Sequence, residues 1–265
     1  MALEAAKSQY RQVADLLRAA IEREDYAPGS LLPSESELAA EWSVSRVTIN
    51  RAVQLLRGEG MVRVLRGRGT AVRAIPPIRR NSTLRYAQRS REEGGSRGAF
   101  DFELKRLGLK PATKLAQLGQ VPAPEAAREV LGLAAGESVL IRKREMFASD
   151  EAVLLATSYF PWTLAEQAGV TETDTGPGGT YSRLAEIGKG PVRFSEDLRV
   201  RSPTAAEERF FALAETQQVY EIVHISYLPD GTAIEYREDV LPTHQWVMHY
   251  EWNAENDTAG RESTS

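Results

Sequence analysis

Arginine is concentrated in one part of this chain of 265 residues. Residues 1–80 contain 13 basic and 9 acidic residues, a net charge of +4, whereas residues 81–265 contain 20 basic and 28 acidic residues, a net charge of −8. Clustered guanidinium groups suit a polyanion, although a basic surface that faces only solvent has the same charge. Between positions 46 and 80, Glu59 is the one acid among nine arginines: Arg46, Arg51, Arg57, Arg63, Arg66, Arg68, Arg73, Arg79 and Arg80.

Three predicted helices precede or carry the first of these arginines. Apolar residues at helical spacing predict an amphipathic helix from Gln9 to about Glu24. Ser34 stands three residues before Glu37, a capping-box spacing that opens a short second helix through Glu41. Either serine of the WSVS turn, Ser43 or Ser45, can cap the third helix, so the last two helices form a helix-turn-helix. The apolar side of the third helix includes Val47, Ile49, Ala52, Val53, Leu55 and Leu56.

A predicted hairpin follows the third helix. MVRVL alternates apolar and basic residues, and RGRGT supplies a glycine turn before a second strand. Together with the helices, this pattern predicts a winged helix-turn-helix. The third helix fits the major groove of DNA, and glycines in the hairpin tip let the backbone approach phosphates. The candidate DNA contacts from this reasoning are Arg46, Thr48, Asn50, Arg51, Arg66, Arg68, Gly69 and Thr70.

The order LLPSESELA, SVSRVTINRAVQLLRGEG and RGRGTAV, over about residues 8–75, resembles the DNA-binding domain of the GntR family of bacterial transcription regulators. The resemblance implies that the binding mode carries over, because Arg46, Thr48 and Gly69 match. Ser36 and Asn50 stand where the family often has arginines, and asparagine can pair with adenine through two hydrogen bonds. Ser34, Ser36 and Ser45 complete the candidate DNA contacts. We assign residues 1–75 to this domain.

Residues 76–95 are rich in proline, glycine and charge without periodic apolar residues, and we expect a linker there. Beyond them, long strands alternate with helices, which predicts an α+β fold with an antiparallel sheet. Helices are expected at 100–108, 124–133, 180–188 and 203–213, and strands at 114–122, 137–150, 151–161, 193–203 and 247–252, with a hairpin over 218–242 that turns at Pro-Asp-Gly. The polar residues 253–265 are expected to form a disordered tail.

Residues 96–252 resemble the effector-binding UTRA domain of the HutC subfamily, which has a chorismate lyase-like fold. The telling segments are GAFDFELKRLGLKP, VLIRKREMFASDEAVLLATSYFP, TYSRLAEIG and PDGTAIEYREDVLP. Members that sense phosphorylated sugars use arginines and hydroxyls for the anion. Arg144 and Glu235 match the family pattern, whereas Met146 replaces an arginine, Ala156 a glutamate, Gly179 a serine and Leu241 a tyrosine. We therefore expect a bulkier, less charged effector.

Aromatic residues near these positions have two interpretations. Phe100, Tyr159 and Tyr181 either line the effector cleft or belong to the core, and Glu235 either faces the cleft or lies on a solvated strand face. The candidate effector-binding residues are Phe100, Arg144, Met146, Ala156, Tyr159, Gly179, Tyr181, Glu235 and Leu241.

Several other classes of protein find no support in the sequence. The chain has no cysteine, so disulfides and thiol nucleophiles are excluded. His224, His244 and His249 lack metal-ligand spacing, and no GxSxG, Walker or HExxH motif is present, so we expect no metal, cofactor or catalysis. No run of 18 apolar residues and no signal-peptide pattern occur, which predicts a cytoplasmic protein without a membrane partner.

The resemblance implies a homodimeric repressor of transcription. Two winged heads bind double-stranded DNA at an inverted-repeat operator, and a small-molecule effector releases them. Two alternatives stay open: a dimeric DNA-binding protein that ignores ligands, and an enzyme that uses the chorismate lyase-like domain with Arg144 and Glu235 in its site.

Overall fold

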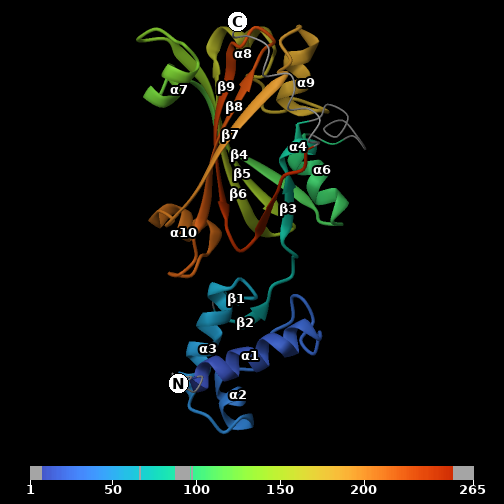
Figure 1. Cartoon of the computed structure of the whole chain (residues 1–265), viewed down its shortest axis with the longest axis vertical. Helices are drawn as coiled ribbons and strands as arrows, with labels where there is room; N and C mark the ends of the chain where they lie inside the picture. The colour runs from blue at the N-terminus through green and yellow to red at the C-terminus, as the bar shows by residue number, and fades with distance from the viewer. Residues whose placement is uncertain (1–7, 66, 87–95, 97, 253–265) are drawn as a thin grey trace, which may run out of the picture. The chain divides into compact units, whose positions relative to one another are not determined.

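The computed structural model describes residues 8–65, 67–86, 96 and 98–252 (Figure 1). The chain divides into two compact units, which we describe separately. One contains the residues up to Pro77 with Val200–Tyr220 and Leu241–Gln245, and the other contains Ile78–Arg199, Glu221–Val240 and the residues from Trp246 onward. Arg66, residues 87–95 of the predicted linker and the tail predicted at 253–265 lie outside the described residues.

The first unit begins with the predicted winged helix-turn-helix, which the structure confirms. Its helices pack around one apolar core, with Leu17, Ile49 and Leu56 fully buried. Strands β1 and β2 form an antiparallel hairpin, and Leu31 pairs with Ala71 to add a third short stretch to it. The elements are α1 (Gln9–Glu22), α2 (Glu35–Glu41), α3 (Arg46–Gly58), β1 (Val62–Leu65) and β2 (Gly69–Val72).

Two serine caps begin the second and third helices. The Glu37 amide donates to Ser34 Oγ at 3.2 Å while the Ser34 amide donates to Glu37 Oε2 at 2.7 Å, which is the predicted capping box. Ser45, rather than Ser43, caps α3, because its Oγ accepts from the Thr48 amide at 3.1 Å. Ser43 lies in the turn with φ 53°, the left-handed conformation that lets the chain reverse between the helices.

A six-stranded sheet forms the centre of the second unit. The strand order is β4-β5-β6-β9-β8-β7, and β4 to β5, β5 to β6 and β6 to β9 pair antiparallel. The sheet confirms the predicted α+β class. Its strands are β4 (Pro111–Pro122), β5 (Ser138–Ala148), β6 (Glu151–Pro161), β7 (Arg193–Arg201), β8 (Val219–Tyr227) and β9 (Ala233–Pro242).

Helices connect these strands, largely where the sequence predicted them. The pattern missed α8, which follows β6 directly, and Ala165 of this helix is buried in the core beside Leu140 and Phe160. The helices are α6 (Ala99–Arg106), α7 (Glu125–Val130), α8 (Trp162–Gln167), α9 (Gly179–Glu186) and α10 (Ala205–Phe211).

Part of the segment expected as a linker is regular structure. Residues 78–85 form β3 (Ile78–Asn81) and α4 (Ser82–Arg85), and β3 pairs in parallel with β10 (Trp246–His249). The Trp246 indole donates to the Val153 carbonyl oxygen at 2.7 Å, so β10 is fastened to the main sheet. In Figure 1, α4 and α6 lie beside β3. Only residues 73–77 separate β2 from β3, so the connection is much shorter than predicted.

Candidate functional sites

The amino-terminal end of α3 forms an exposed polar surface. Arg46, Asn50 and Arg51 are exposed, as predicted for residues that contact DNA, and Ser36 is exposed on α2. Val47 lies among them and is 63% exposed, so it is not part of the apolar face of the helix. A valine at the second position of the helix points away from the core because Ile49, Ala52 and Val53 already occupy the buried side.

Three of the predicted DNA contacts have structural duties as well. The hydroxyls of Ser34 and Ser45 accept the capping hydrogen bonds, and Ser45 Oγ lies 2.8 Å from Thr48 Oγ1. Ser34 keeps its hydroxyl hydrogen for a phosphate oxygen, and of Ser45 and Thr48 one donates to the other, so only one of that pair keeps a hydrogen to donate. Asn50 Nδ2 donates to Glu35 Oε1 at 2.7 Å, so this carboxylate, which the sequence reasoning overlooked, lies on the same surface.

The acid within the basic run is neutralised by the first helix. Arg18 Nη2 lies 2.8 Å from Glu59 Oε1, and Arg18 Nε donates to Glu59 Oε2 at 3.0 Å. Such a forked pair fixes the carboxylate at the far end of α3 from Arg46. The basic residues at the amino-terminal end of the helix therefore have no acid from their own basic run beside them.

The hairpin tip depends on glycine. Gly67 has φ 73° and Gly69 has φ 111°, both in the region that favours glycine. A Cβ at Gly67 would meet no heavy atom within 4 Å, so conformation and not crowding requires this residue. Arg68 and Gly69 are exposed and Thr70 is half-buried, whereas Arg66 lies outside the described residues. The tip thus presents Arg68 and bare backbone to solvent.

A cavity of about 480 Å³ lies in the second unit, a size suited to a small metabolite. Seven of the nine predicted effector residues line it: Phe100, Arg144, Met146, Ala156, Gly179, Tyr181 and Glu235. Their contact with an effector stays a prediction. The wall is formed by β4, β5, β6 and β9 together with the segments before α6 and α9.

Two predicted effector residues do not line this cavity. Tyr159 differs in parity from Ala156 along β6, so its ring faces the opposite side of the sheet, where it lies 6.2 Å from the Tyr236 ring. Leu241 has the parity of Glu235 but lies near the end of β9, beyond the cavity, and is 1% exposed. The interpretation of Tyr159 as a core residue was therefore the better one.

The sequence reasoning missed several charged residues of the wall. Arg142 precedes Arg144 by two residues on β5, and Arg237 and Asp239 follow Glu235 at the same interval on β9. Side chains at i and i+2 share one face of a strand, so this alternation was the signal that could have identified all three. Arg85 and Tyr86 also line the cavity, from the segment taken for a linker.

Four arginines line the cavity, and two of them are paired, Arg85 with Glu103 and Arg237 with Asp239. The bulkier, less charged effector expected from the sequence stays a prediction. Arg144 Nη2 donates to Ser158 Oγ at 2.8 Å, and its buried Nε has no hydrogen-bond partner among the described residues. Burial and the nearby Arg237 guanidinium lower the pKa of Arg144. Burial and Arg144 together lower the pKa of Arg142 to about 10. Crowded guanidinium groups of this kind are stabilised by an anion.

Arg142 organises the rim of the cavity. Its guanidinium donates to the carbonyl oxygens of Val170 at 2.7 Å and Glu172 at 2.6 Å. These bonds hold the loop that leads to α9, and Thr173, Asp174 and Thr175 of that loop line the cavity. Arg142 positions the wall, whereas Arg144 lines the cavity and bonds Ser158.

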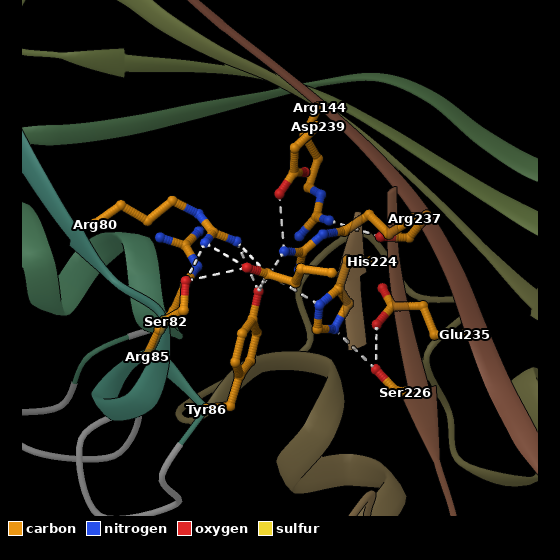
Figure 2. A network of polar contacts seen from close by, with 12 residues as sticks. Arg80, Ser82, Arg85, Tyr86, Arg144, His224, Ser226, Glu235, Arg237 and Asp239 are labelled. Carbon is orange, nitrogen blue, oxygen red and sulfur yellow. Dashed lines mark hydrogen bonds and ion pairs between the residues drawn. The ribbon is translucent and has the colours of Figure 1, made fainter. Parts of the chain in front are cut away.

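A buried network of polar side chains adjoins the cavity (Figure 2). The Tyr181 hydroxyl donates to Glu235 and lies 2.7 Å from Ser226 Oγ and 3.0 Å from His224 Nε2. Burial alone would raise the pKa of Glu235, but the Arg237 guanidinium and the Tyr181 hydrogen bond hold it below its ordinary value. Glu235 is therefore an ionised acceptor, 2% exposed, at the cavity wall.

Among the described residues, no group of three or more His, Asp or Glu side chains has an arrangement that could hold a metal ion. No helix in the described part of the chain is both long and apolar enough to cross a membrane.

Comparisons with known proteins match both units. Residues 106–245 match the family described as "UTRA domain", and residues 9–72 match "Bacterial regulatory proteins, gntR family". The HTH-type transcriptional regulator GgaR of Escherichia coli K12 is 30% identical over 86% of this chain and 84% of its own. The mannosyl-D-glycerate transport/metabolism system repressor MngR of the same organism is 24% identical over 89% of this chain and 92% of its own.

A solved structure shares the fold along most of the chain. The crystal structure of PhnF from Mycobacterium smegmatis superposes with a TM-score of 0.57 at 23% identity, covering 93% of this chain and 100% of that one.

Proposed function

Since this chain belongs to the GntR family of bacterial transcription regulators and carries a UTRA domain, we propose that it is a repressor that an anionic metabolite releases from its operator. The observation that supports this most directly is the set of arginines, Arg85, Arg142, Arg144 and Arg237, around one cavity. The exposed amino-terminal end of α3 supports the DNA-binding half of the proposal.

The cavity favours an effector with two chemically different ends. Arg144 places a guanidinium on the wall for a phosphate or carboxylate, while Glu235 and Asp239 accept hydrogen bonds from hydroxyl or amine groups. Met146, Leu154 and Ala156 form an apolar patch between strands β5 and β6. An anion that carries hydroxyl groups and a compact apolar face fits this wall.

The operator is proposed to be an inverted repeat bound by a homodimer. One helix in one major groove reads only a few bases, and a two-fold dimer doubles that contact on a two-fold DNA site. We place this activity in the cytoplasm, where chromosomal DNA lies in bacteria. No turnover of the effector is proposed, because release of DNA requires only that the effector bind the two states of the protein unequally.

Selection of genomic DNA tests the first half of the proposal. Purified full-length protein is incubated with fragments of its native genome, bound fragments are sequenced, and gel-shift titrations follow at several salt concentrations. We expect a palindromic site whose affinity falls steeply with salt, as phosphate contacts require. Arg46→Ala is expected to lose about 1–3 kcal/mol of binding free energy if this residue reads a base. Arg23→Ala, an exposed arginine beyond the carboxyl-terminal end of α1, is the matched control.

Release of that operator tests the second half. Fractions of a cell extract are added to the complex, with Arg144→Met as the variant that keeps side-chain bulk but removes the guanidinium. We expect one fraction to release the wild-type protein and to release Arg144→Met at least about fivefold less well, in the range of ordinary allosteric coupling. Release of both proteins by the same amount of extract, or binding of DNA unaffected by every fraction, would contradict an anionic effector in this cavity.

A further inference from the structure

We propose that Arg80 is a positioning residue that transmits the state of the cavity to β3, the strand that follows the DNA-binding domain. This inference rests on the proposed function and concerns how the effector site is connected to the rest of the chain. Such transmission requires a chain of buried contacts from the cavity to β3, and these contacts must have two alternative arrangements.

The strand end of the path is held by one arginine. Arg80 lies in β3, is 0% exposed, and donates through Nη1 to Glu196 Oε2 at 2.7 Å and to Ser82 Oγ at 2.6 Å. Its Nη2 bonds Glu196 as well and lies 3.0 Å from the Tyr86 hydroxyl. Five residues, 73–77, connect β2 to β3, so Arg80 lies on the first strand after the DNA-binding domain along the chain.

Glu196 is the junction of the path. In addition to Arg80, it accepts hydrogen bonds from the Tyr86 hydroxyl at 2.6 Å and from Ser82 Oγ at 3.0 Å, and it lies 3.2 Å from His224 Nδ1. Burial alone would raise the pKa of Glu196, but the His224 hydrogen bond and the Arg80 guanidinium hold it well below its ordinary range. One ionised carboxylate thus joins β3, α4, β7 and β8.

Two residues connect this junction to the cavity. Tyr86 lines the cavity directly, and its hydroxyl accepts from Arg237 Nη2 at 3.0 Å while it donates to Glu196. Its ring is stacked on the His224 ring, with centroids 4.5 Å apart. His224 supplies the second connection, because its Nε2 lies 3.0 Å from the hydroxyl of Tyr181, another wall residue.

The second connection has two hydrogen-bond arrangements. Because Glu196 only accepts, His224 Nδ1 carries the hydrogen and the neutral ring offers Nε2 as an acceptor. Burial and Arg237 lower the pKa of His224, which keeps the ring neutral. Tyr181 and Ser226 each have one hydrogen and two acceptors in reach, His224 Nε2 and Glu235 Oε2. Either Tyr181 donates to Glu235 and Ser226 to His224, or the two hydroxyls exchange roles.

An effector selects between these arrangements. A hydroxyl that donates to Glu235 competes with Tyr181 and favours donation from Tyr181 to His224, whereas an anion that binds Arg237 weakens its bond to Tyr86. Both events change the groups that contact Glu196, and Arg80 is the group on β3 that is fully buried against that carboxylate. A change in the contacts of Glu196 therefore reaches β3 through the bond between Arg80 and Glu196.

A double-mutant cycle tests the path in the full-length protein without a ligand. Amide hydrogen exchange of a peptide that covers Ile78–Asn81 is measured in the wild type, Glu235→Gln, Glu196→Gln and the double variant. Glu235→Gln removes a charge at the cavity wall, where the proposed path begins, and Glu196→Gln removes the charge of the carboxylate that Arg80 contacts. We expect Glu235→Gln to change the exchange rate of β3 by about threefold or more in the wild-type background and to have no further effect once Glu196 is replaced. Thr113→Val, on the cavity wall at β4, is the control and leaves β3 exchange unchanged.

The same factor for Glu235→Gln in both backgrounds, or no change of β3 exchange at all, would overturn the proposal. Thermal unfolding identifies a variant that fails to fold, in which case Tyr181→Phe replaces Glu235→Gln and Arg80→Lys replaces Glu196→Gln in the same cycle. Arg80→Lys keeps the positive charge but loses the forked contact with Glu196. If Arg80 served only as a buried cation, the effect of the cavity variant on β3 exchange would be the same in Arg80→Lys as in the wild type. The cycle contains no DNA or effector, so it can fail while operator binding and release succeed.

Discussion

Asn50 on α3 donates a hydrogen bond to Glu35 on α2 across 2.7 Å, so the amide that is expected to read a base is held by a carboxylate. Asn50 is exposed and Glu35 is half-buried, and both lie near the start of their helices. A carboxylate there repels phosphates, accepts from the amino group of cytosine and restricts the rotamers of Asn50. We therefore expect Glu35 to lower the affinity of the protein for DNA of any sequence and to raise its preference for the operator over random DNA.

Replacing Glu35 with glutamine separates these effects. Glu35→Gln keeps the shape of the side chain and removes its charge, so we expect affinity for random-sequence DNA to rise about threefold at low salt, with a smaller rise at high salt. Discrimination between operator and random DNA should fall. Titration of both DNAs at two salt concentrations measures this, with Glu22→Gln on α1 as a control for net charge alone. An equal rise for Glu22→Gln would rule out a local role of Glu35.

Val47 is expected to contact a thymine methyl group. It is 63% exposed beside Arg46, and an apolar side chain at the start of a recognition helix meets the C5-methyl of thymine in the major groove. Replacing the contacted thymine by uracil, which lacks that methyl, should weaken wild-type binding by about 1 kcal/mol. The same operator change should have no effect on Val47→Ser. If no thymine in the operator shows this difference between the two proteins, Val47 does not read a methyl group.

Tyr181 and Tyr159 make a matched pair for stability. Tyr181→Phe leaves the buried Glu235, Ser226 and His224 short of one hydroxyl partner, and we expect it to lower the free energy of unfolding by about 1–3 kcal/mol. Tyr159→Phe, on the other side of the sheet, should change it by less than about 0.5 kcal/mol. Denaturant unfolding of both variants measures the difference. Equal losses would show that the Tyr181 hydroxyl has no special place in the network.

The buried histidine predicts a pH dependence of stability. Because the pKa of His224 is lowered in the fold, chiefly by burial, the unfolded chain takes up a proton below about pH 6.5 that folded His224 refuses. The stability that neutral His224 provides above that pH is lost as the pH falls, with a slope of at most about 1.4 kcal/mol per pH unit. Unfolding at pH 7.5, 6.5 and 5.5 should show a shallower decline for His224→Gln than for the wild type. Parallel declines in the two proteins would contradict a lowered pKa.

Local patterns predicted much of the fold. The spacing of Ser34 and Glu37 identified the start of α2, because a capping box is a contact between neighbours in sequence. The Asp-Gly turn between β8 and β9 was predicted for the same reason: Gly231 has φ 86°, and the Thr232 amide donates to Asp230. Such features depend on a few adjacent residues and not on the rest of the chain.

Features that depend on distant residues were not predicted. Arg80 looks like a solvated charge in the sequence, and only its partner Glu196, 116 positions away, explains why it is fully buried. The segment IPPIRRNS shows no regular spacing of apolar residues. Its strand, β3, pairs with β10, which lies far along the chain, and a local pattern does not reveal such a partner. Arg142, Arg237 and Asp239 were within reach of prediction, since strand alternation from Arg144 and Glu235 places them on the same wall.

The parallel ribbon of β3 and β10 ties the first segment after the winged helix to the last described strand. A protein terminated after Gln245 would still contain every strand of the six-stranded sheet and every helix of the first unit. It would lack the neighbour of β3 and the Trp246 indole that bonds Val153. A nonsense mutation at the Trp246 codon is therefore expected to yield a folded regulator that occupies its promoter and no longer responds to inducer.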